Sequence, residues 1–215
     1  MKKSLLFVLV AFALSITAQA TIINCQPAGD IAWYYGQAQP GDTLLMADGV
    51  YDEAYTMDFD KEGVVLKAAE GAKPVIALTG EWTTIGLYAS TTFDGITFDG
   101  TNVCYYPISS YGSDAGTYAF KNCEFTGWMY WAISNHYESN THVDNVLIEN
   151  CIFHDAAGSA IYFNDDAPTG EHSCGYFEMK NSTLYNLVED EYVGVIHVSS
   201  RSEATGEQNK VVIDH

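Results

Sequence analysis

A short phrase of alternating apolar and polar residues recurs along the chain. Three copies read FKNCEF at 120–125, IENCIF at 148–153 and MKNSTL at 179–184, and FDGITF at 93–98 fits the same template. Such alternation is typical of a β-strand with one buried face. The starts lie 27, 28 and 31 residues apart, and a fifth copy begins 34 residues later at Ile213. A loosely kept period of this length indicates stacked repeats.

Each phrase is followed by a second β-rich stretch. These stretches are YWAISNHY around Ile133, SAIYFND around Ile161 and YVGVIHVSS around Val195, and Gly, Asn and Asp turns separate them from the phrases. No helical period lies between them. Because a single coil cannot bury its own apolar face, the coils must stack. The pattern predicts an all-β, right-handed parallel β-helix of five or six coils over residues 43–215, with equivalent residues about 4.8 Å apart.

Aligned on the repeat, equivalent positions form columns with distinct roles. An asparagine column follows the first strand, and asparagine accepts turn backbone and can bond its amide to the next coil. We therefore expect a structural role for this column. We expect the cysteines beside it to be buried free thiols, although stacking would bring their Cα atoms within disulfide range. The asparagines are Asn122, Asn150 and Asn181, and the cysteines are Cys123 and Cys151.

The outward position before each asparagine alternates in charge. An ion-pair ladder is the favoured interpretation of this alternation, and lysines that hold a sugar acid are the alternative. The column reads Asp94, Lys121, Glu149, Lys180, Asp214.

The two ends of the predicted solenoid differ. Residues 28–38 predict a capping helix with Asp30 as N-cap and Pro40-Gly41 as the stop. Its aromatic and aliphatic side chains would cover the first coil; they are Ile31, Trp33, Tyr34 and Tyr35. No closing segment follows the last strand-like run. We therefore expect residues 21–215 to be one β-helix domain truncated at its C-terminus, and the isolated fragment to self-associate through open strand edges.

Residues 1–20 have the composition of a secretory signal peptide. Lys2 and Lys3 precede a short apolar run, and Ala18-Gln19-Ala20 is a cleavage sequence. We expect export to the periplasm, the cell surface or the medium, with no membrane insertion. The mature chain keeps seven basic residues against 28 acidic ones, a net charge of −21. Nucleic acid is therefore excluded as a partner, and an anionic glycan would need a bridging cation. The oligomeric state is left open.

Polar residues that end the second strand of each coil form the candidate site. Glu138, Asp165 and Asp166 are oxygen donors that could bind Ca²⁺. His136 is a candidate catalytic base, and Arg201 could hold a substrate carboxylate or act as the base. The alternative is a set of solvated turn residues.

Aromatic residues are dense in the same part of the chain. Trp128, Tyr130 and Trp131 lie close in sequence to one another and follow Tyr105 and Tyr106. Exposed rings would bind a polysaccharide substrate by stacking on sugar faces, whereas buried rings would pack the coils. The sequence leaves both interpretations open.

The segment QPGDTLLMADGVYDE at 39–53 resembles the first coil of secreted pectate-lyase-like β-helix proteins, including chondroitinase B and the alginate lyases. IENCIFHDAAGSAIYF at 148–163 is similar to later coils of that superfamily and to uncharacterised secreted bacterial β-helix domains. The resemblance implies β-elimination on an acidic polysaccharide, in which Ca²⁺ neutralises a uronate and Lys or Arg removes a proton. The lysine and arginine motifs of those lyases are not recognisable here. A secreted polysaccharide lyase is therefore one hypothesis, a non-catalytic glycan-binding or cell-surface protein is the alternative, and a hydrolase is a third.

Overall fold

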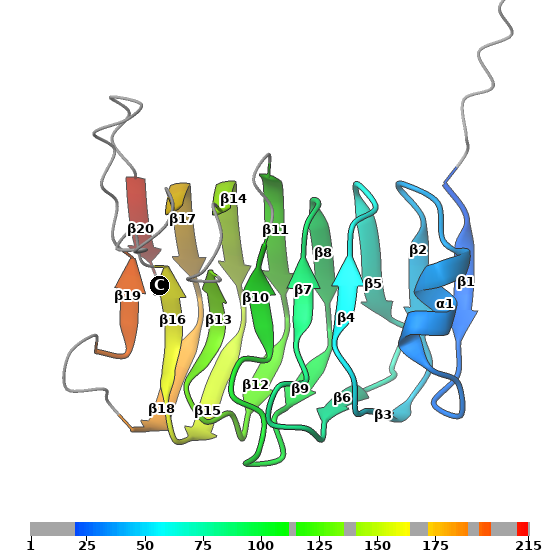
Figure 1. Cartoon of the computed structure of the whole chain (residues 1–215), viewed down its shortest axis with the longest axis horizontal. Helices are drawn as coiled ribbons and strands as arrows, with labels where there is room; N and C mark the ends of the chain where they lie inside the picture. Colours follow the sequence, from blue (N-terminus) through cyan, green and yellow to red (C-terminus); the bar gives the residue numbers. More distant parts are fainter. Residues whose placement is uncertain are drawn as a thin grey trace, which may run out of the picture.

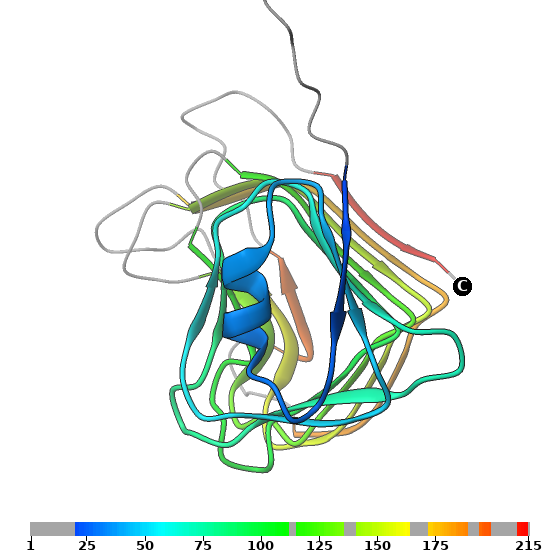
Figure 2. The ribbon, with the colours of Figure 1, turned by 90° about the vertical axis from the view of Figure 1, so that its right-hand side faces the viewer.

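A computed structural model describes residues 20–111, 115–135, 141–163, 172–188, 194–198 and 210–214. The predicted signal peptide, apart from Ala20, lies outside these residues. The described chain is almost entirely β, and its strands wind repeatedly through three parallel sheets (Figure 1). Viewed along its axis, the molecule is a three-sided solenoid (Figure 2). The predicted right-handed parallel β-helix is confirmed.

Sheet A has eight strands and contains the first strand of each repeat. In sheet order its strands are β1 (Ile22–Cys25), β2 (Thr43–Met46), β5 (Val64–Ala68), β8 (Thr91–Asp94), β11 (Ala115–Lys121), β14 (Thr141–Glu149), β17 (His172–Lys180) and β20 (Lys210–Asp214).

Sheets B and C have six strands each and contain the second and third strands of the coils. Sheet B consists of β3 (Gly49–Glu53), β6 (Pro74–Leu78), β9 (Thr97–Asp99), β12 (Glu124–Thr126), β15 (Ile152–Ala156) and β18 (Thr183–Leu187). Sheet C consists of β4 (Met57–Phe59), β7 (Ile85–Leu87), β10 (Ile108–Ser110), β13 (Trp131–Asn135), β16 (Ser159–Phe163) and β19 (Ile196–Val198).

The core is built from side chains stacked in register between coils. Phe98, Phe125 and Phe153 form one stack, with ring centroids 4.8 and 4.6 Å apart and nearly parallel planes. Phe93 stacks on Phe120 at 5.3 Å in the same way. These separations match the spacing of strands in a sheet, so each ring packs on the ring of the next coil. The inward columns predicted from the repeat are confirmed.

The asparagine column holds the corner between sheets A and B. Asn122, Asn150 and Asn181 have φ of 53°, 55° and 49°. This left-handed backbone is costly for most residues but is accepted by asparagine. The Asn150 amide donates to Asn122 Oδ1 at 3.3 Å, and the Asn122 amide donates to Asp94 Oδ1 at 2.7 Å. The predicted structural role of this column is confirmed.

All five cysteines are buried free thiols. Cys123 and Cys151 lie one coil apart beside the asparagine column, and each thiol contacts backbone carbonyls of its own coil and of the preceding coil. The interpretation of these residues as core thiols is confirmed.

Helix α1 (Ile31–Gln37) lies across one open end of the solenoid (Figure 2). Asp30 caps it as predicted, because its Oδ1 accepts a hydrogen bond from the Ala32 backbone at 2.6 Å. Ile31 and Tyr35 are buried against the first coils. The prediction is wrong for Trp33, which points to solvent because it lies on the opposite face of this short helix. Strand β1, which precedes the helix and extends sheet A, was not predicted.

No helix within the described residues has the length and apolar character needed to cross a membrane.

Candidate functional site

The residues of the predicted charged edge lie outside the described part of the chain. They are His136, Glu138, Asp165, Asp166 and Arg201. Their catalytic roles and their binding of Ca²⁺ therefore remain predictions. Among the described residues, no group of three or more His, Cys, Asp or Glu side chains is placed to hold a metal ion.

The structure does define the strands that lead into these segments. Ile133 pairs with Ile161, and Ile161 pairs with Ile196, so the three strands are in register. Strands β13, β16 and β19 are direct neighbours in sheet C. The chain therefore leaves neighbouring strands of one sheet at the same edge, immediately before the predicted polar residues.

Trp128 is a core residue, which corrects its prediction as a substrate-binding residue. Its side chain is fully buried, and its Nε1 donates a hydrogen bond to the Ser159 carbonyl at 2.9 Å. Its ring packs edge-on against Phe153. The indole lies inside the corner between sheets B and C, so neither ring face can reach a ligand. Sequence density alone could not separate it from its exposed neighbours.

Tyr130 and Trp131 belong to a continuous band of rings that we call the aromatic strip. Tyr130 is about half exposed, at 49%, and Trp131 is partly buried. The strip crosses five consecutive coils along sheet C, from the turn before β7 to β19. Its members are Trp82, Tyr105, Tyr106, Tyr130, Trp131, Tyr162 and His197.

Two kinds of contact hold the strip together. At its first end, Trp82 contacts Tyr105, and Tyr105 contacts Tyr130. Each of these two contacts is edge-on, with ring centroids 4.9 Å apart. At its other end Trp131 stacks on Tyr162 at 3.9 Å with planes 9° apart, and Tyr162 stacks on His197 at 5.2 Å. Tyr106 joins the two halves through Tyr130 and Trp131. Mutual packing fixes these rings, so a ligand would meet a surface that is already ordered.

The strip lies on an acidic molecule, and a nearby carboxylate changes the pKa of one tyrosine of the strip. The charge of Glu81 raises the pKa of the Tyr105 phenol, with a smaller contribution from burial. Trp82, the most exposed ring of the strip at 65%, follows Glu81 directly. Trp82 and Tyr130 are the exposed rings of the strip, whereas Trp131, Tyr162 and His197 cover part of one another's faces by stacking. The strip therefore offers exposed rings, hydroxyl groups and a nearby carboxylate rather than a basic surface.

A second polar cluster lies on the outer side of sheet B. His154 Nε2 lies 2.8 Å from Glu124 Oε1, and His154 Nδ1 lies 2.7 Å from Asp155 Oδ2. Tyr185 stacks on the imidazole from the next coil, and the Asn186 amide donates to Asp155 Oδ1 at 2.9 Å. Desolvation would lower the pKa of His154, but its hydrogen bonds to Asp155 and Glu124 together raise it. Both ring nitrogens are therefore engaged, and the cluster joins three coils rather than presenting a free base.

This cluster was not predicted from the sequence. Glu124 and His154 are 30 residues apart, and only the register of β12 with β15 brings them together.

The register of the outward charge column is confirmed. The two lysine ion pairs found there, however, each join a member of the column to a residue outside the predicted column. Lys67 Nζ lies 3.3 Å from Asp94 Oδ2 across neighbouring strands. Lys180 instead pairs with Glu178 on its own strand, at 2.8 Å. Both pairs are partly exposed, so each contributes little to stability.

Comparison with solved structures identifies relatives of the fold. Two structures of the PL6 family alginate lyase AlyGC, one of them a mutant, each align with a TM-score of 0.66, at 19–20% sequence identity over 90–91% of this chain. The chain spans about a third of the length of those lyases, 32–33%. A pectin methylesterase mutant in complex with a hexasaccharide aligns with a TM-score of 0.41 at 14% identity.

No protein-family model matches the sequence. No curated protein matches it either. The likeness to solved structures at these identities concerns the fold. Together with the three parallel sheets and the stacked columns, it shows that the chain has a parallel β-helix fold.

Proposed function

We propose that this protein is an exported polysaccharide-binding β-helix and that the aromatic strip is its binding surface. The observation that carries the proposal is the unbroken band of rings across five coils of sheet C. The exposed rings Trp82 and Tyr130 can pack against the apolar faces of sugars, while the hydroxyl groups of the strip bond to sugar hydroxyls. The strip is long and open, which suits an extended polymer better than a small compact ligand.

Charge limits the class of polysaccharide. The mature chain carries a net charge of −21, so it repels an anionic polymer unless a cation lies between them. A neutral glycan, or an acidic glycan bridged by Ca²⁺, is therefore the proposed ligand class. The predicted acidic residues Glu138, Asp165 and Asp166 would supply the ligands for such a bridge.

Substitution of the stacked pair tests the binding proposal. Trp131→Ala and Tyr162→Ala each remove one ring of the closest stacked contact, so we expect glycan affinity to fall about tenfold or more. Trp33→Ala is the matched control, because Trp33 is 62% exposed but lies on the capping helix away from the strip. Glycan-array screening followed by titration calorimetry provides the measurement. Equal loss in the control variant, or no binding by the wild type, would contradict the proposal.

Lyase activity is the second candidate function. The fold likeness to a PL6 family alginate lyase favours it. Strands β13 and β19, which precede His136 and Arg201 in the sequence, both pair with β16 in one sheet. If the protein is a lyase, polyuronates such as alginate or pectate should yield unsaturated products that absorb ultraviolet light. Chelation of Ca²⁺ should abolish this signal, and Arg201→Ala should remove most of it. Binding without such products would leave the binding function alone.

A further inference from the structure

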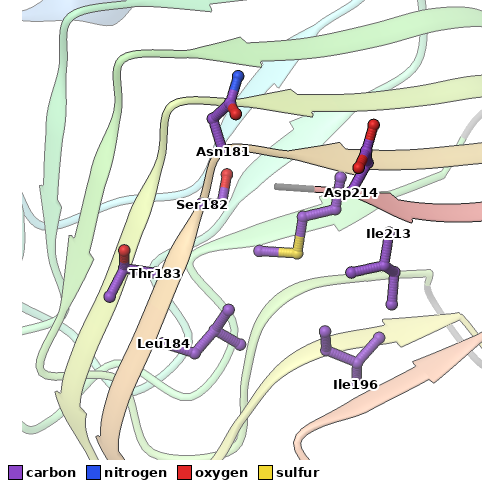
Figure 3. A pocket seen from close by; sticks show the side chains of 8 residues that line it. Asn181, Ser182, Thr183, Leu184, Ile196, Ile213 and Asp214 are labelled. Carbon is purple, nitrogen blue, oxygen red and sulfur yellow. The ribbon is translucent and has the colours of Figure 1, made fainter.

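Strand β1 lies at the end of the solenoid that carries helix α1 (Figures 1 and 2). Within the described residues it pairs with β2 alone. At the other end, Met179, Leu184, Ile196 and Ile213 are the last described members of the inward columns (Figure 3). The segments that adjoin β19 and β20 lie outside the described residues. The contacts that close a coil are therefore defined at the end that carries β1.

A tight turn fixes the carboxylate of Asp42 just before β2. The Asp42 backbone N–H donates to the Gln39 carbonyl at 3.0 Å, and Gly41 has φ of 83°, as in a Pro-Gly type II turn. Asp42 Oδ2 in turn accepts a hydrogen bond from the Gln39 backbone at 2.7 Å. Asp42 is only 3% exposed. The turn therefore holds a buried carboxylate whose other oxygen, Oδ1, can accept from β1.

Thr21, the residue before β1, donates to that second oxygen. Thr21 N lies 2.7 Å from Asp42 Oδ1, and the Thr21 side chain also bonds to the carboxylate. The Thr43 backbone N–H donates to the Thr21 carbonyl at 2.9 Å, which begins the pairing of β1 with β2. Hydrogen bonds from Gln39 and Thr21 lower the pKa of the Asp42 carboxyl, so this group is ionised at neutral pH. Thr21 N therefore contacts a negative charge.

Thr21 is also the residue that follows the predicted cleavage sequence at 18–20. Hydrolysis of the Ala20–Thr21 peptide bond consumes one water and leaves a carboxylate on Ala20 and an α-amino group on Thr21. An α-amino group has an ordinary pKa of about 7.7–8.0, so it takes up a proton at neutral pH. Both residues are exposed, so cleavage removes no buried side chain from the described coils. A neutral amide beside Asp42 would thereby become a positive charge.

We propose that cleavage after Ala20 completes this end of the solenoid, because the new ammonium group of Thr21 forms an ion pair with Asp42 and fixes β1 against β2. Charge-assisted hydrogen bonds are roughly twice as strong as neutral ones. The turn already holds the carboxylate, so the pair has to order only the start of β1. The proposal rests on the predicted signal peptide and is independent of glycan binding.

One other charge acts on Asp42. Lys61, in the turn before β5, lowers the pKa of Asp42 by its charge, but less than the hydrogen bonds do. Its Nζ donates to the Tyr35 carbonyl at 2.6 Å and to the Gly36 carbonyl at 3.2 Å, near the end of helix α1. Lys61 is therefore engaged by the helix, and the ammonium group of Thr21 is the direct partner of the carboxylate.

A cycle of four proteins tests the ion pair. One chain begins at Thr21, released from a cleavable tag, and a second chain retains residues 18–20. At pH 7 the folding equilibrium constant of the first chain, measured by urea unfolding, should be about tenfold higher. Asp42→Asn should make the two chains equally stable. Asp30→Asn is the matched control, because asparagine also caps a helix, and it should keep the tenfold difference.

The pH dependence separates charge from hydrogen bonding without any substitution. Pairing with Asp42 raises the pKa of the Thr21 α-amino group, by about one unit for a tenfold effect. The advantage of the cleaved chain is therefore complete below about pH 7 and is lost as pH rises through the folded pKa. The two chains should become equally stable by about pH 10. A difference of the same size at pH 6 and pH 10 would overturn the proposal.

Identification of the first residue tests the cleaved bond itself. The full chain is expressed with its leader, recovered after export and subjected to N-terminal sequencing. Thr21 as the first residue supports the proposal, and any other first residue overturns it. Equal stability of the two chains at pH 7 would overturn it as well, as would a difference that Asp42→Asn leaves intact. Glycan affinity should be the same in both chains, so failure here is distinct from failure of the binding proposal.

Discussion

At the scale of single residues, His154 shows how the solenoid turns distant polar residues into one network. Glu124, His154 and Asp155 come from two neighbouring coils, and each ring nitrogen of His154 faces a carboxylate. The imidazole is largely covered, with 13% of its side chain exposed. Because the charge of this ring depends on pH, its contribution to the stability of the coils depends on pH as well.

The pH dependence of stability follows from two opposite pKa shifts. The pKa of His154 is raised above 6.5, so its stabilising effect is complete below that value and is lost as pH rises through the folded pKa. The pKa of Asp155 is lowered from 3.8 by its hydrogen bonds to His154 and Asn186, so its contribution is lost as pH falls through the lowered value. The network is therefore most stabilising between these two limits.

A His154→Gln variant tests this dependence. We expect the difference in unfolding free energy between wild type and variant to be largest near about pH 5–6 and to shrink toward pH 8, as His154 loses its proton. Urea unfolding at several pH values measures it. His142→Gln is the control, because the His142 side chain is 41% exposed and faces Asp144 at the surface. A difference that stays constant with pH would show that the ring acts by packing alone.

The role of a residue was predictable from the sequence where its column repeats in several coils. It was not predictable at a corner between two sheets. Asn122, Asn150 and Asn181 recur at one offset, so the sequence revealed their shared role. Trp128 and Tyr130 are two residues apart, yet one is buried and the other exposed. Strict alternation does not hold through a corner between two sheets, and sequence alone could not assign these rings to the core or to the surface.

At the scale of elements, the corners of the coil are as regular as the strands. A second left-handed column lies after sheet B, where Gly127, Asp155 and Asn186 have φ of 69°, 49° and 51°. This column was not predicted from the sequence, because three different residue types occupy its equivalent positions. Each type accepts positive φ, glycine because it lacks Cβ and the others through local side-chain hydrogen bonds.

Two substitutions of Asn150 can distinguish the cost of its left-handed backbone from the loss of its side-chain hydrogen bond. Asn150→Ala should lower the unfolding free energy by about 1–2 kcal/mol, because alanine pays the cost of left-handed backbone and cannot bond Asn122. Asn150→Gly should cost less, since glycine accepts this backbone, as Gly95 does at the equivalent position with φ of 75°. Denaturant unfolding measures both. An equal cost for the two variants would assign the effect to the lost amide bond instead.

At the scale of the whole molecule, the repeat made the fold predictable and left the function open. Every coil repeats the same apolar columns, so the sequence contained several copies of the information that specifies the sheets. The predicted charged edge has no such redundancy, because His136, Asp165 and Arg201 occupy different positions in segments outside the described strands. The aromatic strip also depends on register between coils, and single segments show only scattered rings.

The length of the strip predicts how affinity depends on the length of a glycan. Each coil adds about 4.8 Å along the axis, which is close to the length of one sugar in an extended chain, and the strip crosses five coils. We expect affinity to rise with each added sugar up to about five and then to level off, because further sugars extend past the rings. Titration of a graded oligosaccharide series measures this dependence, and in Tyr162→Ala the plateau should come at shorter chains. Full affinity for a disaccharide would show that one local pocket, rather than the strip, binds the ligand.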